Sequence, residues 1–280
     1  MNNHAGLEGF RWLFIIEGLI TVVSVVPLLW LLPDWPALAR FLTEDDKNFV
    51  QDRVAVKGGG YTSRKSTRAE ILATVCSPRM MLHYTAYLTD CIPLGSLTFF
   101  TPTIVAGLGY DSIFAQLMTV PPWVMGYFVS LSLGYSADRF NARGLHVFGA
   151  SMIGGIGWLT AGLLPPDAYK ARYGMLFLCA CGAFPSTGPL SAWVTCNVPA
   201  FATLAIATAL NNSMAGISQL IAQWIWKDSE ELQGFPTGNF TCAAMSFITA
   251  GIALSLRFTY GRMNKHKAKD TTGNDRIWLL

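Results

Sequence analysis

The chain has 280 residues, of which 52% are hydrophobic and only 13% are charged. Soluble globular domains carry about 25% charged residues, so this composition argues against a soluble protein. The formal net charge is +3, and the basic residues are spread over the connections between apolar stretches, which gives no support to a nucleic-acid-binding surface.

Long apolar stretches dominate the chain and contain none of its 20 Lys and Arg residues. Each has 16 to 27 residues, and a helix needs ~20 residues to cross the hydrocarbon of a bilayer. Lipid offers the backbone no hydrogen-bond partner, which favours helix in every spanning segment. The sequence therefore predicts an all-α, polytopic membrane protein with seven transmembrane helices, at Trp12–Leu32, Leu82–Ala106, Ala115–Ser136, Val147–Leu164, Gly174–Thr195, Ala200–Trp226 and Thr241–Leu256.

The basic residues between these stretches predict their orientation. Sixteen of the 20 fall in the first connection, the third connection and the C-terminal tail, and four fall on the opposite side. Because basic residues are enriched in cytoplasmic loops, we expect the first connection and the C-terminus in the cytoplasm. An odd number of spans then places the N-terminus outside.

Residues 1–32 form the outer N-terminus and the first span. No basic leader and no small-residue cleavage site precedes the apolar run, so we expect it to stay in the bilayer rather than to be removed as a signal peptide. Glu17 lies near the outer end of this span. We interpret it as a packing or topology residue that could reach the interface, and leave a functional role open.

Residues 33–81 form the long connection. Thr43 precedes Glu44, Asp45 and Asp46, which is typical of an N-cap followed by acidic residues in the first helical turn. The pattern predicts a short amphipathic helix, about Glu44–Val56, on the membrane surface or on the inner face of the protein. The run of glycines at 58–60 ends it.

Asp90 lies inside the second span, where an ionised carboxylate costs about 2.5–3.5 kcal/mol. Such a group faces a cavity, pairs with another residue or takes up a proton. On the helical period, Leu97 and Thr101 fall on the same face as Asp90. Two interpretations stay open: a substrate or proton site, and a polar anchor hydrogen-bonded to a neighbouring helix.

Prolines interrupt several of the spans. Proline removes a backbone donor and kinks a helix, and transporters use broken helices around their substrate. We interpret the fifth span as cavity-lining, although kinks are also common in membrane helices. The prolines are Pro93 and Pro102 in the second span, Pro121 and Pro122 in the third, and Pro185 and Pro189 in the fifth.

The sixth span carries a stripe of small and amide side chains at helical spacing. Such residues either let helices pack closely or line a wet pathway, and three amides favour the pathway. The stripe consists of Thr208, Asn212, Gly216, Gln219 and Gln223.

The remaining patterns predict packing rather than chemistry. Most of the six cysteines fall within or at the rim of spans, as small buried hydrophobes do, and they lack zinc-ligand spacing. The glycine-rich string from Gly149 to Gly157 is typical of helix packing. Asn239-Phe240-Thr241 is a formal glycosylation sequon, but it abuts the last span, so we expect poor access for the transferase. We expect no metal, no cofactor and no enzyme.

Four strings carry a resemblance to a known family. They are Arg11–Gly18; Leu32–Pro36 with Phe41–Asp45; Thr101–Val105 with Leu108–Tyr110, Ala115–Leu117 and Val120–Pro122; and Gly134–Arg139. Together they resemble the major facilitator superfamily and, within it, the fungal allantoate/nicotinate/pantothenate permease group of anion:cation symporters. The last string resembles the superfamily's signature loop, in its C-terminal copy.

The resemblance implies the C-terminal part only of that fold, with helices 6–12 of a twelve-helix transporter. The domains are then residues 1–32, the cytoplasmic loop 33–81, the six-helix half 82–256 and the basic cytoplasmic tail 257–280. The implied function is proton-coupled symport of a small organic anion. Because alternating access rocks one half against the other, a non-transporting remnant or regulatory fragment is the alternative, and a missing N-terminal half is the implied partner.

The resemblance also implies site residues. Substrate contacts are expected on helices seven, ten and eleven of the family, which are the second, fifth and sixth spans here. The signature loop helps to hold the two halves together at the cytoplasmic face. The substrate candidates are Asp90, Thr101, Trp193, Asn212 and Gln219, and the signature-loop residues are Gly134, Asp138 and Arg139. We expect the plasma membrane, with a vacuolar membrane as the alternative.

Two other classes of membrane protein fit the sequence less well. A seven-helix receptor would carry Asp-Arg-Tyr at the end of the third span and Asn-Pro-x-x-Tyr in the seventh, and neither string occurs there. A membrane-bound enzyme would need clustered His or acidic residues at a span end, and the sequence has no such cluster.

Overall fold

The computed structural model describes residues 9–32, 39, 41–57, 67–109, 112–198 and 201–267. The chain divides into two compact units, Met1–Ser63 and Arg64–Leu280. The described residues of both units are helical and contain no strand, which confirms the all-α prediction.

The first unit contains helices α1 (Gly9–Leu31) and α2 (Glu44–Lys57). Thr43 Oγ1 accepts a hydrogen bond from the Asp46 backbone N–H at 3.3 Å, and Asp46 Oδ2 accepts one from the Thr43 N–H at 3.4 Å. This reciprocal capping satisfies two backbone donors at the start of α2. The predicted helix after Thr43 is therefore confirmed, while its glycine stop at 58–60 lies outside the described residues.

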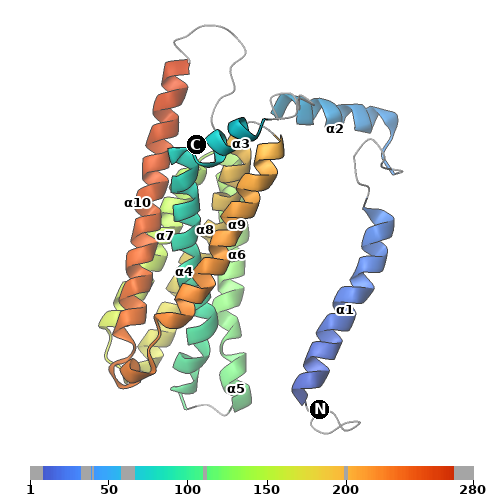
Figure 1. The fold of residues 1–280 in the computed structure, drawn as a ribbon. Helices are drawn as coiled ribbons and strands as arrows, with labels where there is room; N and C mark the ends of the chain where they lie inside the picture. The colour runs from blue at the N-terminus through green and yellow to red at the C-terminus, as the bar shows by residue number, and fades with distance from the viewer. Residues whose placement is uncertain are drawn as a thin grey trace. The chain divides into compact units, whose positions relative to one another are not determined.

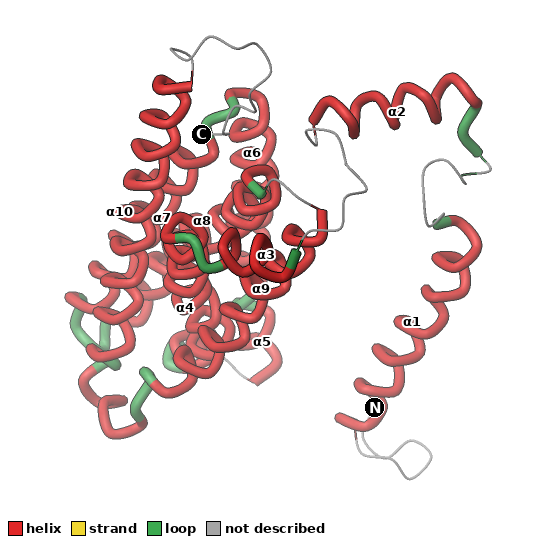
Figure 2. The backbone as a smooth tube through the Cα atoms, turned by 45° about the horizontal axis from the view of Figure 1, so that its top comes forward, coloured by secondary structure: helices red, strands yellow, loops and turns green. Residues whose placement is uncertain are grey.

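The second unit is a bundle of long helices that run side by side (Figures 1 and 2). Helix α8 packs against α4, α6, α7 and α9, and α4 also packs against α9 and α10. The elements are α3 (Arg68–Val75), α4 (Pro78–Ala106), α5 (Ser112–Leu117), α6 (Val120–Phe140), α7 (Arg143–Leu163), α8 (Tyr169–Asn197), α9 (Phe201–Trp224), the 3₁₀ helix η3 (Asp228–Gln233) and α10 (Pro236–Lys267).

Several boundaries differ from the prediction. Helix α3 lies in the connection that was expected to hold only one helix, and α10 continues past Leu256 to Lys267. The predicted helix ends followed apolarity alone. A helix satisfies its own backbone hydrogen bonds, so it can extend beyond the apolar stretch into water. Helices α4 and α8 run through their prolines, and the third predicted span is divided between α5 and α6, with Pro121 and Pro122 in the first turn of α6.

Length and composition identify membrane spans among the described residues. Five helical segments are long and apolar enough to cross a bilayer: Phe14–Leu31, Pro78–Ala106, Ile113–Phe140, Tyr169–Asn197 and Pro236–Lys265. Helices α7 and α9 occupy the other two predicted spans and are not among these five segments. The chain is a polytopic membrane protein.

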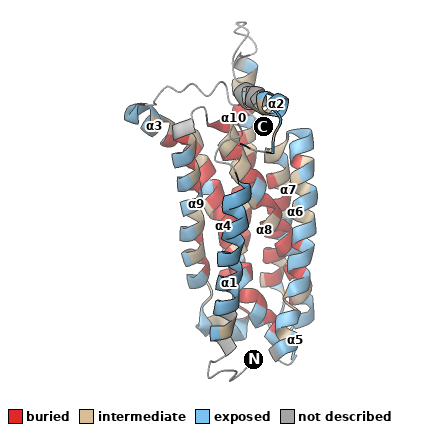
Figure 3. Cartoon of the chain, turned by 90° about the vertical axis from the view of Figure 1, so that its right-hand side faces the viewer, coloured by how far each residue is buried: buried red, intermediate tan, exposed pale blue. Residues whose placement is uncertain are grey.

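The surface of the second unit is apolar where lipid would lie. Buried residues concentrate on the inner faces of the bundle (Figure 3). Large apolar side chains of α6, such as Val124, Phe128 and Leu131, are exposed. Soluble monomers rarely expose contiguous apolar patches of this kind, because their contact with water is unfavourable.

One close helix contact in the bundle depends on glycine. A Cβ atom on Gly182 of α8 would lie 2.2 Å from the Cα of Gly154 of α7. Only a residue without a side chain allows this approach, which is how small residues serve membrane helices. Gly154, Gly155 and Gly157 of the α7 string therefore serve helix packing, as predicted, whereas an added Cβ on Gly149 would meet nothing within 4 Å.

Candidate functional site

Asp90 of α4 sits in a polar junction between α4 and α8. Its side chain is only 4% exposed. Oδ1 accepts a hydrogen bond from Ser186 Oγ at 2.5 Å, and Oδ2 accepts one from Thr187 Oγ1 at 3.2 Å. Both donors belong to α8, so the buried carboxylate links two helices.

The hydroxyl groups around Asp90 have other acceptors within reach. Ser186 Oγ lies 3.1 Å from the carbonyl oxygen of Gly182 and 3.0 Å from that of Ala183. Thr187 Oγ1 lies 3.2 Å from the Ala183 oxygen. A hydroxyl carries one proton, so each can donate either to Asp90 or to its own helix. The sequence supplies this arrangement by placing Ser186 and Thr187 between Pro185 and Pro189.

Helix α4 makes further polar contacts with its other neighbours. Thr89 Oγ1 lies 2.7 Å from Thr249 Oγ1 of α10, and Ser218 Oγ of α9 donates to the Leu88 carbonyl at 2.8 Å. Cys242 Sγ of α10 donates to Ser96 Oγ at 3.1 Å. Polar contacts of this kind join membrane helices. Those of α4 lie before and after Asp90 along the helix.

Thr101 and Trp193 lie apart from this junction. The Thr101 hydroxyl donates to the Leu97 carbonyl of its own helix at 2.6 Å, and the residue is 1% exposed. Trp193 is fully buried, and its ring meets that of His83 edge-on, with centroids 5.2 Å apart. In this structure both residues contribute to the packing of the bundle.

The predicted stripe of α9 faces largely outward. Asn212 and Gln223 are exposed, and Gln219 is half-buried against Gly95 of α4, where its Oε1 would lie 2.7 Å from an added Cβ. The residues of α9 that are buried mostly lie one position before those of the predicted stripe. The buried face is therefore a neighbouring face of the helix, the one that packs against α4. That face carries Thr203, Ala207, Asn211, Ser218 and Ala222.

Asn211 is a buried polar residue that the sequence argument missed. Neither its Nδ2 nor its Oδ1 has a hydrogen-bond partner among the described residues. The i, i+4 spacing of Ala207 and Asn211, repeated by Ser218 and Ala222, is the signal that would have identified this face.

His83 is a second missed group. It is 1% exposed, and its Nε2 lies 2.9 Å from the hydroxyl of Tyr260. The pair joins the first turns of α4 to the far end of α10. The sequence placed His83 at a span end but had no means of pairing it with a residue 177 positions away.

The signature-loop residues lie at the end of α6. Asp138 Oδ1 accepts a hydrogen bond from Arg143 Nη2 at 2.8 Å, which ties α6 to the start of α7. Arg139 is exposed, and an added Cβ on Gly134 would meet nothing within 4 Å. A contact of Asp138 or Arg139 with an N-terminal half stays a prediction.

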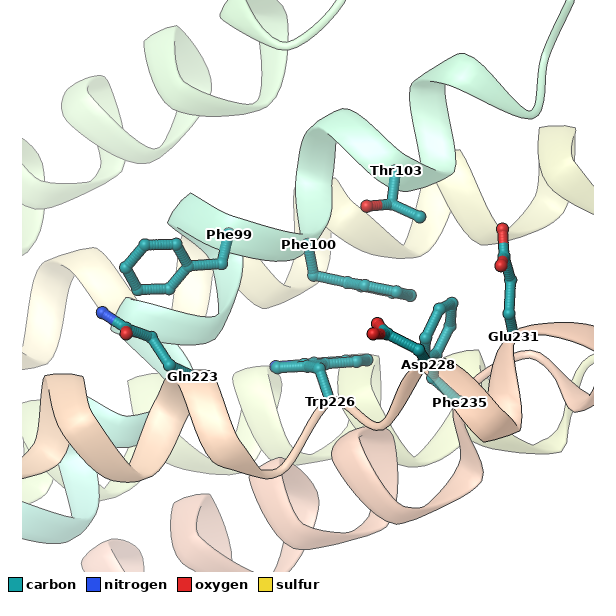
Figure 4. Close-up of a pocket in the computed structure, with 8 residues that line it drawn as sticks. All are labelled: Phe99, Phe100, Thr103, Gln223, Trp226, Asp228, Glu231 and Phe235. Carbon is teal, nitrogen blue, oxygen red and sulfur yellow. The ribbon is translucent and has the colours of Figure 1, made fainter.

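A cavity of about 500 Å³ lies where α4, α9 and η3 meet (Figure 4). Aromatic rings and two carboxylates share its wall. The lining residues are Phe99, Phe100, Thr103, Gln223, Trp226, Asp228, Glu231 and Phe235.

Glu230 of η3 caps the start of α10 next to this cavity. Its Oε1 accepts from the Thr237 hydroxyl at 2.6 Å and its Oε2 from the Thr237 backbone N–H at 2.9 Å. These hydrogen bonds, the one from the Thr237 hydroxyl first, lower the pKa of Glu230 below its usual value. Lys227 Nζ lies 3.7 Å from Glu230 Oε1 and so has a carboxylate partner that stays charged.

The described part of the chain shows no metal-binding group of three or more His, Cys, Asp or Glu residues. The cysteines within the bundle, Cys91, Cys179, Cys181 and Cys242, are buried free thiols.

Comparison with known proteins gives a consistent picture. Residues 4–223 match the family model described as Major Facilitator Superfamily. The MFS transporter prlL of Fungal sp. (strain NRRL 50135) is 37% identical over 281 aligned positions, covering 100% of this chain and 57% of the relative. The major facilitator-type transporter hxnP of Emericella nidulans is 27% identical, covering 96% of this chain and 54% of the relative. The chain spans about half the length of these relatives.

Proposed function

The chain belongs to the major facilitator superfamily, and from that membership we propose that it provides helices 6–12 of a membrane transporter that carries a small organic anion together with a proton. The superfamily's alternating access, in which one half of the fold rocks against the other, supplies the mechanism. The buried carboxyl group of Asp90 is the observation that carries the proposal.

Asp90 has the position expected of a proton-carrying group. An ionised carboxylate within a span costs about 2.5–3.5 kcal/mol, so membrane proteins keep one mainly where it pairs or functions. The partners of Asp90 are neutral hydroxyls from Ser186 and Thr187. They stabilise its charge without a counter-ion, so uptake of a proton breaks no ion pair.

Both protonation states of Asp90 can be satisfied at this junction. When the group is ionised, the two hydroxyls donate to it. When it is protonated, its O–H can donate to Ser186 Oγ, while the Ser186 proton turns to the carbonyl of Gly182 or Ala183. A site that accommodates both states can accept and release a proton with little rearrangement of the helices.

The organic anion and the narrower permease group are proposed from the resemblance of the sequence. We propose allantoate, nicotinate or pantothenate as the class of substrate. The exposed amides Asn212 and Gln223 of α9 support a pathway along this helix. Residues that face a water-filled pathway need no partner within the bundle.

Uptake into proteoliposomes tests this proposal. Radiolabelled allantoate, nicotinate and pantothenate are presented with and without an inward proton gradient. One sample holds the chain alone, and another holds a fusion in which the part of prlL not matched by the chain precedes it. We expect gradient-stimulated uptake of at least one carboxylate by the fusion. Uptake by neither sample would favour the alternative, a non-transporting remnant or regulatory fragment.

Asp90→Asn tests the proton-carrying group within the same assay. Asn is nearly isosteric and can still accept from Ser186, so the fold should persist, but it cannot ionise. We expect gradient-driven uptake to fall to background. Asp167→Asn, at an exposed carboxylate in the α7–α8 loop, is the matched control and should transport normally. Unchanged gradient dependence in Asp90→Asn would remove this residue from the mechanism.

A further inference from the structure

The cavity at the end of α4 has an aromatic wall in which three of the four rings contact one another. The rings of Phe100 and Trp226 are stacked, with centroids 3.7 Å apart and planes 16° apart. Phe235 meets both rings edge-on, at 5.1 Å from Phe100 and 5.8 Å from Trp226. Phe99, 44% exposed, completes this wall next to Gln223. Aromatic faces carry negative electrostatic potential and attract cations.

The polar part of the cavity is acidic. Asp228 and Glu231 both line it, and Figure 4 shows the Asp228 carboxylate beside the stacked rings. Neither carboxylate forms an ion pair with any residue of the described ranges. The neighbouring basic groups have other partners: Lys227 pairs with Glu230, and Arg172 donates to the Gly234 carbonyl.

The position of the acids follows from the fold. Helix η3 is a short 3₁₀ segment, Asp228–Gln233, between α9 and α10. Gly234 and Phe235 both have positive φ, at 76° and 57°, and turn the chain back towards the bundle. This turn brings the Phe235 ring against Phe100 and Trp226 and leaves Asp228 and Glu231 at the cavity rim.

We propose that this cavity binds a small organic cation, such as an alkylammonium group attached to an aromatic or aliphatic body. Its volume of about 500 Å³ lies within the range of small-molecule sites, about 300–1,000 Å³. The cation rests on the aromatic wall, and Asp228 and Glu231 compensate its charge. Gln223 and Thr103 supply hydrogen-bonding groups at the edge. The site is distinct from Asp90 and does not depend on the proposed transport.

The same chemistry disfavours an anion in this cavity. A carboxylate ligand would meet two carboxylates and the negative faces of the rings, so its binding would be opposed by both. The proposal therefore predicts that the cavity binds a cation more tightly than an anion, whereas a purely apolar pocket would not discriminate between them by charge.

Isothermal titration of the full chain in detergent micelles tests the proposal, with benzyltrimethylammonium as the probe. Benzyl alcohol has the same ring without charge, and benzoate has the same ring with the opposite charge. We expect the ammonium ion to bind roughly tenfold more tightly than either comparator, from charge and cation–π attraction together. Equal affinity for benzyl alcohol would overturn the proposal.

Two isosteric variants test whether Asp228 and Glu231 supply the negative charge that attracts the ligand. Asp228→Asn and Glu231→Gln keep the shape of the cavity wall, and each is expected to weaken binding of the probe several-fold, with about tenfold for the pair. Asp167→Asn, an exposed acid outside the cavity, should bind as the parent does. If both cavity variants bind normally, or if Asp167→Asn weakens binding equally, the assigned site is wrong.

An aromatic variant tests the wall. Phe99→Leu replaces a partly exposed ring by an aliphatic group, so the fold should tolerate it, and circular dichroism checks that it does. We expect about threefold weaker binding of the ammonium ion and little change for benzyl alcohol. An equal loss for both ligands would indicate a simple apolar contact and would contradict the cation–π contribution.

Discussion

Polar residues within the bundle show how a single side chain can be interpreted differently once its partners are known. Asp90 has two hydroxyl donors from α8. Asn239 is fully buried, and its Nδ2 donates to the carbonyls of Gly234 at 3.0 Å and Phe235 at 2.9 Å. In sequence both are polar residues in or beside an apolar segment, and their contacts show that Asp90 links α4 to α8 whereas Asn239 holds the turn before α10.

Asn239 is expected to remain unglycosylated, although Asn239-Phe240-Thr241 forms a sequon. Its amide nitrogen is buried and already donates two hydrogen bonds, so the transferase cannot reach it without unwinding the start of α10. Treatment of the protein, expressed in a eukaryotic host, with an N-glycosidase should leave its electrophoretic mobility unchanged. A mobility shift that disappears in Asn239→Gln would show that this turn opens before folding is complete.

Helices α7 and α8 depend on small residues at one crossing. Gly182 lies against Gly154 with no room for a Cβ, whereas Gly188 on the same helix has nothing within 4 Å of an added Cβ. The two glycines look alike in the sequence, since both fall in the string Gly182-x-x-Pro185-x-x-Gly188. Their roles differ because one faces α7 and the other faces outward.

Gly182→Ala and Gly188→Ala should therefore change stability to different extents. At Gly182 the new methyl group must push α7 and α8 apart, which should destabilise the bundle by about 1–3 kcal/mol. At Gly188 the methyl group meets no atom of another helix, and the gain in helix propensity of at most about 1 kcal/mol is offset by the crowding of a Cβ before Pro189, so we expect little net change. Thermal unfolding in detergent measures both variants. A lower melting temperature for Gly188→Ala than for Gly182→Ala would contradict the packing described for this crossing.

At the scale of the whole molecule, charge distribution predicts how the chain lies in the membrane. Sixteen of the 20 basic residues fall on one side of the predicted spans. We therefore expect a tag at the C-terminus to be cytoplasmic and a tag at the N-terminus to be outside. A tag in the α7–α8 loop at Asp167 should behave like the N-terminal one.

Labelling of intact cells with a membrane-impermeant reagent, each tag carrying one reactive cysteine, checks this orientation. The expected result is labelling of the N-terminal and loop tags and protection of the C-terminal tag until the cells are permeabilised. If the tags at both termini report the same compartment, the prediction of seven spans with the N-terminus outside and the C-terminus in the cytoplasm is wrong.

Much of the fold could be predicted from the sequence, because long apolar stretches without Lys or Arg leave the backbone in lipid no alternative to helix. The first turn of α2 was also predictable, since Thr43 and Asp46 act locally. The candidate site was predictable only in part. Asp90 was identified by its charge within a span, but the burial of Asn211 was not, because two adjacent amides in a sequence do not show which of them faces the neighbouring helix.

The sequence by itself therefore determined the class of protein, the approximate positions of its helices and the presence of a buried acid, because these follow from local composition and from the properties of lipid. The tertiary structure alone decided which hydroxyls meet Asp90, which face of α9 is buried, and that Phe100, Trp226 and Asp228 share one cavity. These features join residues far apart in the chain, and their geometry depends on how the helices pack, which local patterns do not encode.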